Sequence, residues 1–491
     1  MRKSSVKMTS LFILAAMLAS LASCGSSSDS GNDTTAADTS DDTTAEVTTA
    51  LTDEVPKLDF GGAEFRTIEQ ESTQNSFYQE EATGEVVSDA IYNRNAEMEE
   101  RFNVKFTPTE RQGYNEIGKL LEQSVLAGSD DYDLVFGQLF STAALATKGI
   151  LGDWNSVPYM DFDKPWYTKS IQDASVGDNL YMIESDLCIM YTEQTWLLVY
   201  NKTKAEEYPD FPDLYEVVND GKWTIDYMDK LIVDLYRDLN GNTLRDEGDI
   251  FGYGGAQDGC QLAAFLYGCG ARMVEIDSDL NLVQSIASEK AIDALTKLST
   301  LFNVNEGSVH QTDPVQTSVH TRRALFCNGS VVFSPLQVQD LITEDLRSFE
   351  DDYGVLPLPK YDEDQEEYYT LVDGGANIMV FPSNASEDKR EMLGAVTEAM
   401  SAATYNDITP KYCSLALEQK GARDDESMEM IRMILDSRVI DFGYLYDGFK
   451  GWTMKLPDMV KDAGSISSKI ESNKNSVENY YLGVIEYCTE E

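Results

Sequence analysis

The chain has 491 residues, more than one ordinary hydrophobic core accommodates, so two structural lobes are expected. Its hydrophobic content of 42% and aromatic content of 10% are typical of a globular protein. The formal net charge of -48 argues against nucleic acid and anionic lipid as ligands, and it favours a neutral or cationic ligand over an anionic one. Most of the acidic residues are expected on solvated faces, where they keep a secreted protein soluble.

Residues 1–23 are predicted to be a lipoprotein signal peptide. Three basic residues precede the apolar run LFILAAMLASLA, which is too short to span a membrane. The run ends in LASC, which resembles the bacterial lipobox, where cleavage leaves the lipidated Cys24 as the N-terminus. The sequence therefore predicts a lipid-anchored protein on the extracellular face of the cell membrane. An uncleaved signal-anchor is the alternative.

Residues 24–55 are predicted to be a disordered tether. The segment is rich in Ser, Thr, Asp and Ala and has few large apolar residues. It cannot bury enough apolar surface to offset its own ordering entropy. The folded body would therefore be joined flexibly to the lipid.

The first part of the body predicts alternating strands and helices. A strand pair is expected around the Gly-Gly turn at 61–62, and an amphipathic helix is expected from an N-cap at Ser88, with Ile91, Met98 and Phe102 on one face. A strand, a helix closed by glycine and a buried strand follow, at 104–110, 115–128 and 132–138. This β-α-β-α-β succession predicts a parallel sheet covered by helices.

The same alternation recurs further along the chain. Strands are expected at 195–202, 250–255, 329–335 and 374–381, and helices at 224–239, 289–302, 386–404 and 425–440. No internal sequence repeat indicates a solenoid. The fold class is therefore α/β with two lobes.

Six cysteines follow Cys24, and none of them forms a CxxC motif. Cys260 and Cys269 are a potential pair, but most of the six are expected to be buried thiols. The histidines, His310 and His320, lie in no zinc motif.

The segment 238–249, DLNGNTLRDEGD, has the spacing of a calcium-binding loop. Oxygen-bearing side chains occupy loop positions 1, 3, 5, 9 and 12, and the residue at position 7 offers its backbone carbonyl. In that order the predicted ligands are Asp238, Asn240, Asn242, Asp246 and Asp249, with Leu244 giving the carbonyl. Thr243 stands where an EF-hand has glycine, and Asp249 is shorter than the usual glutamate. A structural Ca²⁺ site and a solvated acidic loop remain alternatives.

Several segments in order resemble a known family. They are the lipobox and tether, SDAIYNRNAEMEERFNVKF, GSDDYDLVFGQ, KPWY, WLLVYNK, DGKWTIDYM, RRALFCNGSVVF and YGVLPLPKYD. Together they resemble the extracellular solute-binding proteins of ABC importers, in particular the carbohydrate receptors of the maltose-binding class. The resemblance implies a two-lobed periplasmic-binding-protein-like fold of type II, with the ligand cleft between the lobes. It places lobe 1 at about 56–188 and 376–445, and lobe 2 at about 189–375 and 446–491.

The resemblance also implies where cleft residues lie. Carboxylates and amides exchange hydrogen bonds with sugar hydroxyls, and aromatic rings stack on the apolar faces of sugars. The polar candidates are Glu69, Gln70, Gln138, Glu193, Gln194, Asp258 and Asp373. The aromatic candidates are Phe140, Trp166, Tyr167, Tyr191 and Trp196, with Trp166 and Trp196 expected to stack on sugar. For each aromatic residue core packing is the alternative, and it is favoured outright for Trp154 and Trp223. Leu336 stands where a related receptor has an aromatic.

The resemblance implies a monomeric, non-catalytic receptor that captures a neutral carbohydrate and delivers it to the permease subunits of an ABC transporter. Its membrane contact would be only through the lipid. A receptor for a peptide or another organic solute on the same fold is an alternative. A secreted glycoside hydrolase is another, since acidic residues abound and their separation in space is not given by the sequence. No GxSxG motif or Cys–His pair stands out.

Overall fold

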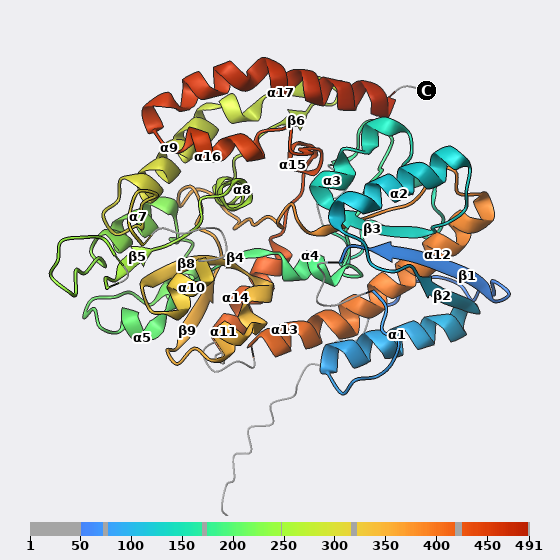
Figure 1. Ribbon diagram of the computed structural model, residues 1–491, viewed down its shortest axis with the longest axis horizontal. Coiled ribbons are helices and arrows are strands. Elements are labelled where there is room, and N and C mark those ends of the chain that lie inside the picture. Colours follow the sequence, from blue (N-terminus) through green and yellow to red (C-terminus); the bar gives the residue numbers. More distant parts are fainter. Residues whose placement is uncertain are drawn as a thin grey trace, which may run out of the picture. The chain divides into compact units, whose positions relative to one another are not determined.

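The computed structural model describes residues 51–71, 77–168, 174–246, 248–315, 322–417 and 425–489. The predicted signal peptide, Cys24 and most of the tether lie outside the described residues, as does His320. The chain from Ala50 to Glu491 forms one unit. Within it, strands and helices alternate as an α/β protein requires (Figure 1).

The strands are β1 (Ala63–Glu69), β2 (Val104–Pro108), β3 (Leu134–Gln138), β4 (Trp196–Asn201), β5 (Phe251–Tyr253), β6 (Glu275–Ile276), β7 (Leu282–Val283), β8 (Val331–Gln337), β9 (Tyr353–Leu356) and β10 (Asn377–Val380). The α-helices are α1 (Val86–Phe102), α2 (Tyr114–Ala127), α3 (Leu139–Ala143), α4 (Ile189–Glu193), α5 (Lys202–Ala205), α6 (Leu214–Asn219), α7 (Ile225–Val233), α8 (Gly259–Gly268), α9 (Glu289–Asn303), α10 (Arg322–Cys327), α11 (Glu344–Arg347), α12 (Glu387–Ala403), α13 (Thr409–Leu417), α14 (Asp425–Asp436), α15 (Phe442–Leu445), α16 (Leu456–Met459) and α17 (Ile466–Thr489).

The first lobe is built on a four-stranded sheet in the order β10-β3-β1-β2. β1 pairs in parallel with β2 and with β3, and β10 is antiparallel to β3 at the edge. The parallel pairing follows from α1 and α2, because each helix returns the chain to the end of the sheet where the next strand begins. Figure 1 shows α2 on one side of this sheet and α1 on the other. The predicted parallel β-α-β-α-β succession is confirmed.

The second lobe is built on a four-stranded sheet in the order β5-β8-β4-β9. β4 is antiparallel to β8 and β9, and β5 is parallel to β8. Every residue of β4 and β8 is buried, which explains why both strands are nearly continuous apolar runs in the sequence. Trp154 and Trp223 are both 0% exposed, so their predicted role in core packing is confirmed.

Two segments connect the sheets, and they run side by side. The chain leaves the first sheet after β3 and enters the second at β4, then returns between β9 and β10. Antiparallel bridges join Ile183 to Met379 and Thr195 to Val372. Paired crossings of this kind leave a hinge between the two sheets. The lobe boundaries stay a prediction. One helix, α14, falls in the range 376–445 that was expected for lobe 1, but it packs on β9 of the second sheet.

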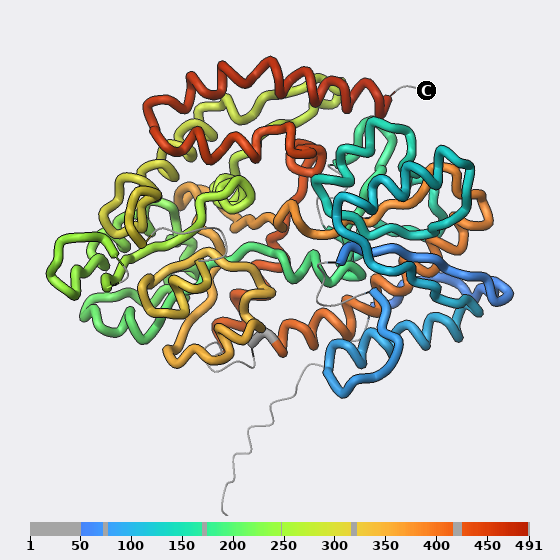
Figure 2. The backbone as a smooth tube through the Cα atoms, in the orientation of Figure 1, coloured from blue at the N-terminus to red at the C-terminus, as the bar shows by residue number. Residues whose placement is uncertain are grey.

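The C-terminal helix α17 contacts elements of both lobes. It packs against the short helical turn Ala146–Lys148 of the first lobe and against α9 of the second. Figure 2 shows this red helix running beside the yellow segment that holds α9. No helix within the described ranges is both long enough and apolar enough to cross a membrane.

Three local predictions are wrong. The residues before Gly61 and Gly62 form no strand, because Phe60 and Gly62 donate to the carbonyls that end α1, so a single strand β1 follows the turn. α1 begins at Val86 with Glu85 as N-cap, not at Ser88. α7 ends at Val233, because the chain is then drawn into an antiparallel bridge between Arg237 and Ile250.

The six cysteines after Cys24 are free thiols. Cys188, Cys269 and Cys488 are buried and the other three are partly buried. Cys260 and Cys269 are not paired, although the sequence left that pairing open. Both belong to the α8 region, where they pack as small side chains.

Candidate functional site

A cavity of about 460 Å³ lies between the two sheets. Its first-lobe wall comes from the ends of β1 and β3 and from Gly375, two residues before β10. Its second-lobe wall comes from the starts of α8 and α10 and the end of β8. The lining residues are Gln70, Tyr114, Gln138, Met190, Gln194, Asp258, Cys260, Arg322, Arg323, Gln337, Gln339, Asp340, Asp373 and Gly375. Strand ends and helix starts of both lobes therefore face one space, which is where ligands bind in open α/β sheets.

The lining is polar and close to charge balance. Five glutamines contribute amides that both donate and accept hydrogen bonds. Three aspartates against two arginines leave a formal excess of one negative charge. Such a surface matches a ligand that is rich in hydroxyl groups and carries little net charge.

The second-lobe wall is held by its own hydrogen bonds. The Gln339 amide donates to Gln337 Oε1 at 2.7 Å, and the Gln337 backbone N–H donates to Asp340 Oδ2 at 2.9 Å. Arg323 donates from Nη1 to the other oxygen of Asp340 at 2.6 Å. These bonds fix the side chains before a ligand arrives, which reduces the entropy that binding would cost.

Asp373 lies on the crossing segment between the sheets. Its Oδ1 accepts from the Gly375 backbone N–H at 2.8 Å, and its Oδ2 accepts from the Gln337 amide at 3.2 Å. Burial, with a smaller contribution from the nearby charge of Asp258, raises the pKa of Asp373 to about 6. Asp373 thus joins a hinge segment to the second-lobe wall and is a strong hydrogen-bond acceptor above pH 6.

Arg322 covers the ring of Trp196, one of the two aromatic residues expected to stack on sugar. Its guanidinium lies over the Trp196 ring, 4.7 Å from the centroid, and Nη1 is 3.7 Å from Asp258 Oδ2. Trp196 is only 1% exposed. In this arrangement Arg322 faces the cavity and Trp196 supports it from behind.

Five of the predicted ligand-binding residues line the cavity: Gln70, Gln138, Gln194, Asp258 and Asp373. Gln70 and Gln138 come from the first-lobe strand ends, as expected. Asp258 has a second role, because its Oδ1 caps α8 by accepting from the Gln261 backbone N–H at 3.0 Å. The structure brings these five together from both lobes.

Seven other predicted residues do not line the cavity. They are Glu69, Phe140, Trp166, Tyr167, Tyr191, Glu193 and Trp196, and each is at most 5% exposed. Glu69 accepts from the Phe77 backbone N–H at 2.9 Å, and Tyr167 donates to Glu398 at 2.6 Å. Trp166 belongs to the hydrophobic core and has no open face for a sugar in this structure.

The remaining three of these are also held internally. Tyr191 accepts from the Thr168 hydroxyl at 2.7 Å. The Arg438 guanidinium lies over the Tyr191 ring, 4.8 Å from the ring centroid. Glu193 is buried beside Tyr412. Phe140 lies against Gly374, where a Cβ atom would be 2.4 Å from its ring. These side chains shape the hinge behind the cavity.

Sequence reasoning missed most of the second-lobe wall. Leu336, which stands where a related receptor has an aromatic, is 0% exposed, and the next residue, Gln337, lines the cavity. Side chains alternate between the two faces of a strand, so the polar Gln337 after a run of apolar residues was the available signal. Arg322 and Arg323 begin the segment RRALFCNGSVVF, and the sequence carries no local signal that they face the cavity.

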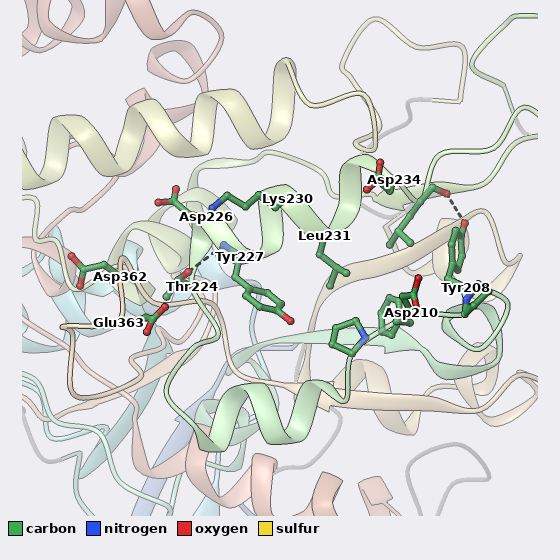
Figure 3. Close-up of a pocket in the computed structure, with 14 residues that line it drawn as sticks. Tyr208, Asp210, Thr224, Asp226, Tyr227, Lys230, Leu231, Asp234, Asp362 and Glu363 are labelled. Atoms are coloured by element: carbon green, nitrogen blue, oxygen red, sulfur yellow. Dashed lines mark hydrogen bonds between the residues drawn. The ribbon is translucent and has the colours of Figure 1, made fainter.

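A larger hollow of about 680 Å³ lies on the second lobe alone. Figure 3 shows it beside α7, with Tyr227 and Leu231 facing Tyr208 and Asp210 across the space and Asp362 at one end. It receives no residue from the first lobe. We assign the ligand site to the smaller cavity because only there do both lobes and the crossing segments contribute.

The predicted calcium loop follows α7 and is exposed. Both carboxylate oxygens of Asp238 accept backbone N–H groups, from Gly241 at 2.7 Å and from Thr243 at 2.9 Å. Asp246 accepts from the side-chain amides of Asn240 at 3.0 Å and Asn242 at 2.8 Å. The side chains at loop positions 1, 3, 5 and 9 thus form hydrogen bonds within one compact turn.

Two further features of this loop concern its ability to hold a cation. Thr243 has φ of 60°, the left-handed conformation that glycine supplies at this position of an EF-hand. Asp249 is 2% exposed, and its Oδ1 is buried without a hydrogen-bond partner. In the part of the chain that the structure describes, no group of three or more His, Cys, Asp or Glu side chains is arranged to hold a metal. A cation here would therefore depend on amide and carbonyl oxygens as well as carboxylates.

No family model and no curated protein matches the chain by sequence. Solved structures match it along most of its length. The cyclic alpha-maltosyl-1,6-maltose binding protein from Arthrobacter globiformis aligns at 12% identity and a TM-score of 0.57, over 87% of this chain and 100% of that one. The fold is that of an ABC-transporter solute-binding protein.

Two other solute-binding proteins align equally broadly. A cyclo/maltodextrin-binding protein in complex with maltotetraose has 13% identity and a TM-score of 0.54, over 89% of this chain and 98% of that one. A solute-binding protein from Thermotoga lettingae bound with alpha-D-tagatose has 15% identity and a TM-score of 0.52, over 86% and 100%. The two-lobed α/β fold expected from the sequence is confirmed.

Proposed function

We propose that the protein is the substrate-binding receptor of an ABC importer and that it captures a neutral oligosaccharide by closing its two lobes. The observation that carries this proposal is the cavity between the sheets, whose wall is made of amides and balanced charges from both lobes. Amides and carboxylates can donate to and accept from sugar hydroxyls, and paired crossings allow the lobes to close over the ligand. Similar proteins in complex with maltotetraose and with tagatose support the same ligand class.

The proposal is tested by screening the purified protein against a panel of neutral oligosaccharides by thermal shift, followed by calorimetry with each glycan that binds. Asp373→Asn should lower the affinity roughly 10- to 150-fold, because it replaces a charge-assisted hydrogen bond of about 1.5–3 kcal/mol to a polar ligand. Gln337→Ala should lower it roughly 2- to 13-fold, because it removes a neutral hydrogen bond of about 0.5–1.5 kcal/mol. Asp279→Asn, an exposed residue outside the cavity, is the matched control. Normal affinity in both cavity variants would contradict the site.

The receptor role also predicts binding without turnover. The bound glycan should be recovered intact after long incubation, as measured by its reducing ends and by mass spectrometry. Cleavage that is lost in Asp373→Asn would favour the hydrolase alternative. UgpB from Mycobacterium tuberculosis in complex with glycerophosphocholine shares this fold at a TM-score of 0.51, so that compound belongs in the screen as the organic-solute alternative.

We propose that the mature protein begins at a lipidated Cys24 and is held by its tether beside a membrane permease. The charged n-region, the apolar run and the lipobox support this in sequence order. Cys24→Ala should abolish labelling with a radioactive fatty acid and release the protein from the membrane. Unchanged labelling in Cys24→Ala would contradict the anchor.

We propose that the loop 238–249 holds one calcium ion with a structural role. Support comes from the oxygen spacing, from Thr243 in the conformation of an EF-hand glycine, and from the unpartnered Asp249 oxygen. An ion that binds only the folded protein stabilises it by mass action. EGTA should therefore lower the melting temperature of the wild type and scarcely change that of Asp238→Ala. Equal responses in both would favour a solvated loop.

A further inference from the structure

The hollow of about 680 Å³ beside α7, called the α7 hollow below, shares no lining residue with the ligand cavity. One face of α7 forms its first wall. The side chains that recur along this face, at the spacing that places residues on one side of a helix, are Tyr227, Lys230, Leu231 and Asp234. The opposite face of α7 is buried in the core of the second lobe. α7 therefore has a core side and a side that faces an open space.

The opposite wall of the α7 hollow is the loop 208–212, and its own contacts hold it in place. The Tyr208 hydroxyl donates to the Leu235 carbonyl at 2.7 Å. The Phe211 ring stacks on Phe333 of β8, with centroids 6.3 Å apart. Two prolines in this loop also fix their own φ angles. The wall is therefore formed before a ligand arrives, which reduces the entropy that binding would cost.

The middle of the α7 hollow is apolar. Figure 3 shows Tyr227 and Leu231 pointing into the space between the two walls. Pro209 and Pro212 on the other wall have no backbone N–H to donate. The Thr224 hydroxyl already accepts from the Tyr227 backbone N–H at 3.2 Å. A peptide backbone or a sugar would find few partners here for its amide or hydroxyl groups, whereas a chain of methylene groups needs none.

Carboxylates lie at both ends of the α7 hollow. Figure 3 shows Asp362 and Glu363 at one end, and Asp210 and Asp234 at the other. Among the residues that the structure describes, no lysine or arginine forms an ion pair with any of these four. In the ligand cavity, by contrast, each arginine has a carboxylate partner. The two ends therefore attract a ligand that is positively charged at both of its own ends.

The nearby lysines leave most of this charge uncompensated. Lys297 pairs with Asp226, the fifth carboxylate of the lining, at 2.8 Å. Lys222, outside the lining, pairs with Asp220 at 2.9 Å. Lys230 is the one lysine or arginine among the lining residues that the structure describes. The charge of the α7 hollow thus complements a cation and repels an anion.

The length of α7 gives the length of the ligand. Asp226 and Asp234 are eight positions apart, which is about 12 Å along the helix axis. An extended chain advances about 1.2 Å per bond, so about ten bonds join one end of the α7 hollow to the other. Spermidine, a linear triamine, has close to this length, and a diamine with a three-carbon chain is much shorter.

We propose that the α7 hollow binds a linear polyamine, with an ammonium group at each carboxylate end and methylene groups over Tyr227 and Leu231. Its volume of about 680 Å³ is within the usual range for small-molecule sites. This site is independent of the saccharide cavity and adds a second ligand class to the protein. A lysine-rich peptide carries the same ammonium groups and is the competing occupant.

The test is calorimetry on the purified protein in 0.15 M NaCl with spermidine, 1,3-diaminopropane, tri-lysine and MgCl₂. Spermidine should bind at one site and roughly fivefold or more tighter than 1,3-diaminopropane, because the shorter diamine reaches one end only. Equal affinities for the two amines, or displacement of spermidine by an equal concentration of MgCl₂, would show unspecific attraction to an acidic protein and refute the site. Tighter binding of tri-lysine than of spermidine would refute the polyamine as occupant.

Variants locate the bound polyamine. Asp210→Asn and Asp362→Asn, one at each end, should each lower the spermidine affinity roughly 2- to 5-fold. Asp279→Asn removes the same charge from an exposed turn elsewhere and is the matched control. Asp373→Asn, in the ligand cavity, should keep the spermidine affinity. Unchanged affinity in both end variants, or a loss confined to Asp373→Asn, would refute the α7 hollow and leave the receptor function untouched.

Discussion

Glu184 makes the stability of this protein depend on pH in a direction that can be calculated. The residue is 0% exposed, next to the Ile183–Met379 bridge of the crossing segments. Burial raises the pKa of Glu184 from 4.5 to about 8, and the neighbouring Arg438 only partly opposes this. The folded protein therefore keeps a proton on Glu184 at pH values where the unfolded chain has released it.

Because the folded state binds the extra proton, raising the pH through this range weakens folding. Ionising the carboxyl in the folded state costs up to roughly 5 kcal/mol for a pKa moved from 4.5 to about 8. Between pH 5 and pH 8 the free energy of unfolding should fall by about 3–4 kcal/mol from this residue alone. Asp373 and Glu398, with pKa values raised to about 6 and about 7 chiefly by burial, act in the same direction.

Glu184→Gln tests the contribution of this one group. Urea unfolding followed by tryptophan fluorescence at pH 5, 6, 7 and 8 gives the pH dependence of the unfolding free energy. The variant should lose markedly less stability than the wild type across this range. Glu100→Gln, an exposed glutamate of α1, should retain the wild-type slope. Equal slopes for wild type and Glu184→Gln would refute the reasoning.

Three further predictions follow from the packing and the cavity. Trp166→Ala should lower the free energy of unfolding by about 3–5 kcal/mol, measured by urea unfolding, yet leave the affinity for saccharide unchanged in calorimetry. The wild-type affinity should fall as the pH drops below 6, because Asp373 then gains a proton, and Asp373→Asn should show a flat profile between pH 5 and 7. Gly374→Ala should cost about 1–3 kcal/mol in urea unfolding, since its Cβ would lie 2.4 Å from the Phe140 ring, and Phe140→Leu should restore part of this loss.

The elements of the first sheet could be predicted well because each has its own local signal. α2 ends at Gly128, which has φ of 65° and caps the helix, and β3 is an apolar run that precedes Gln138. The end of α7 could not be predicted, because its apolar periodicity continues past Val233. There a bridge between distant residues, Arg237 and Ile250, overrides the local preference.

The polar part of the site was easier to predict than the aromatic part. Gln138, Asp258 and Asp373 follow strands or precede glycines, positions that chain topology brings to the cavity. An aromatic residue gives no such positional signal, because the same ring suits a core or a ligand face. Trp166 and Trp196 are each 1% exposed, and only the three-dimensional structure shows that they belong to the core.

The charge of the ligand is decided by the lining of the cavity and not by the acidity of the whole chain. At physiological ionic strength, salt screens exposed charges over about 8 Å, so most of the net charge of -48 does not act on a ligand inside the cavity. Within the cavity, Arg322 lies 3.7 Å from Asp258, and Arg323 binds Asp340 at 2.6 Å. Since each arginine already has a carboxylate partner, an anionic ligand would have to break one of these pairs and leave an aspartate uncompensated. A neutral, hydroxyl-rich ligand can bind beside both pairs without disturbing them, and this local balance supports a saccharide more strongly than the overall composition does.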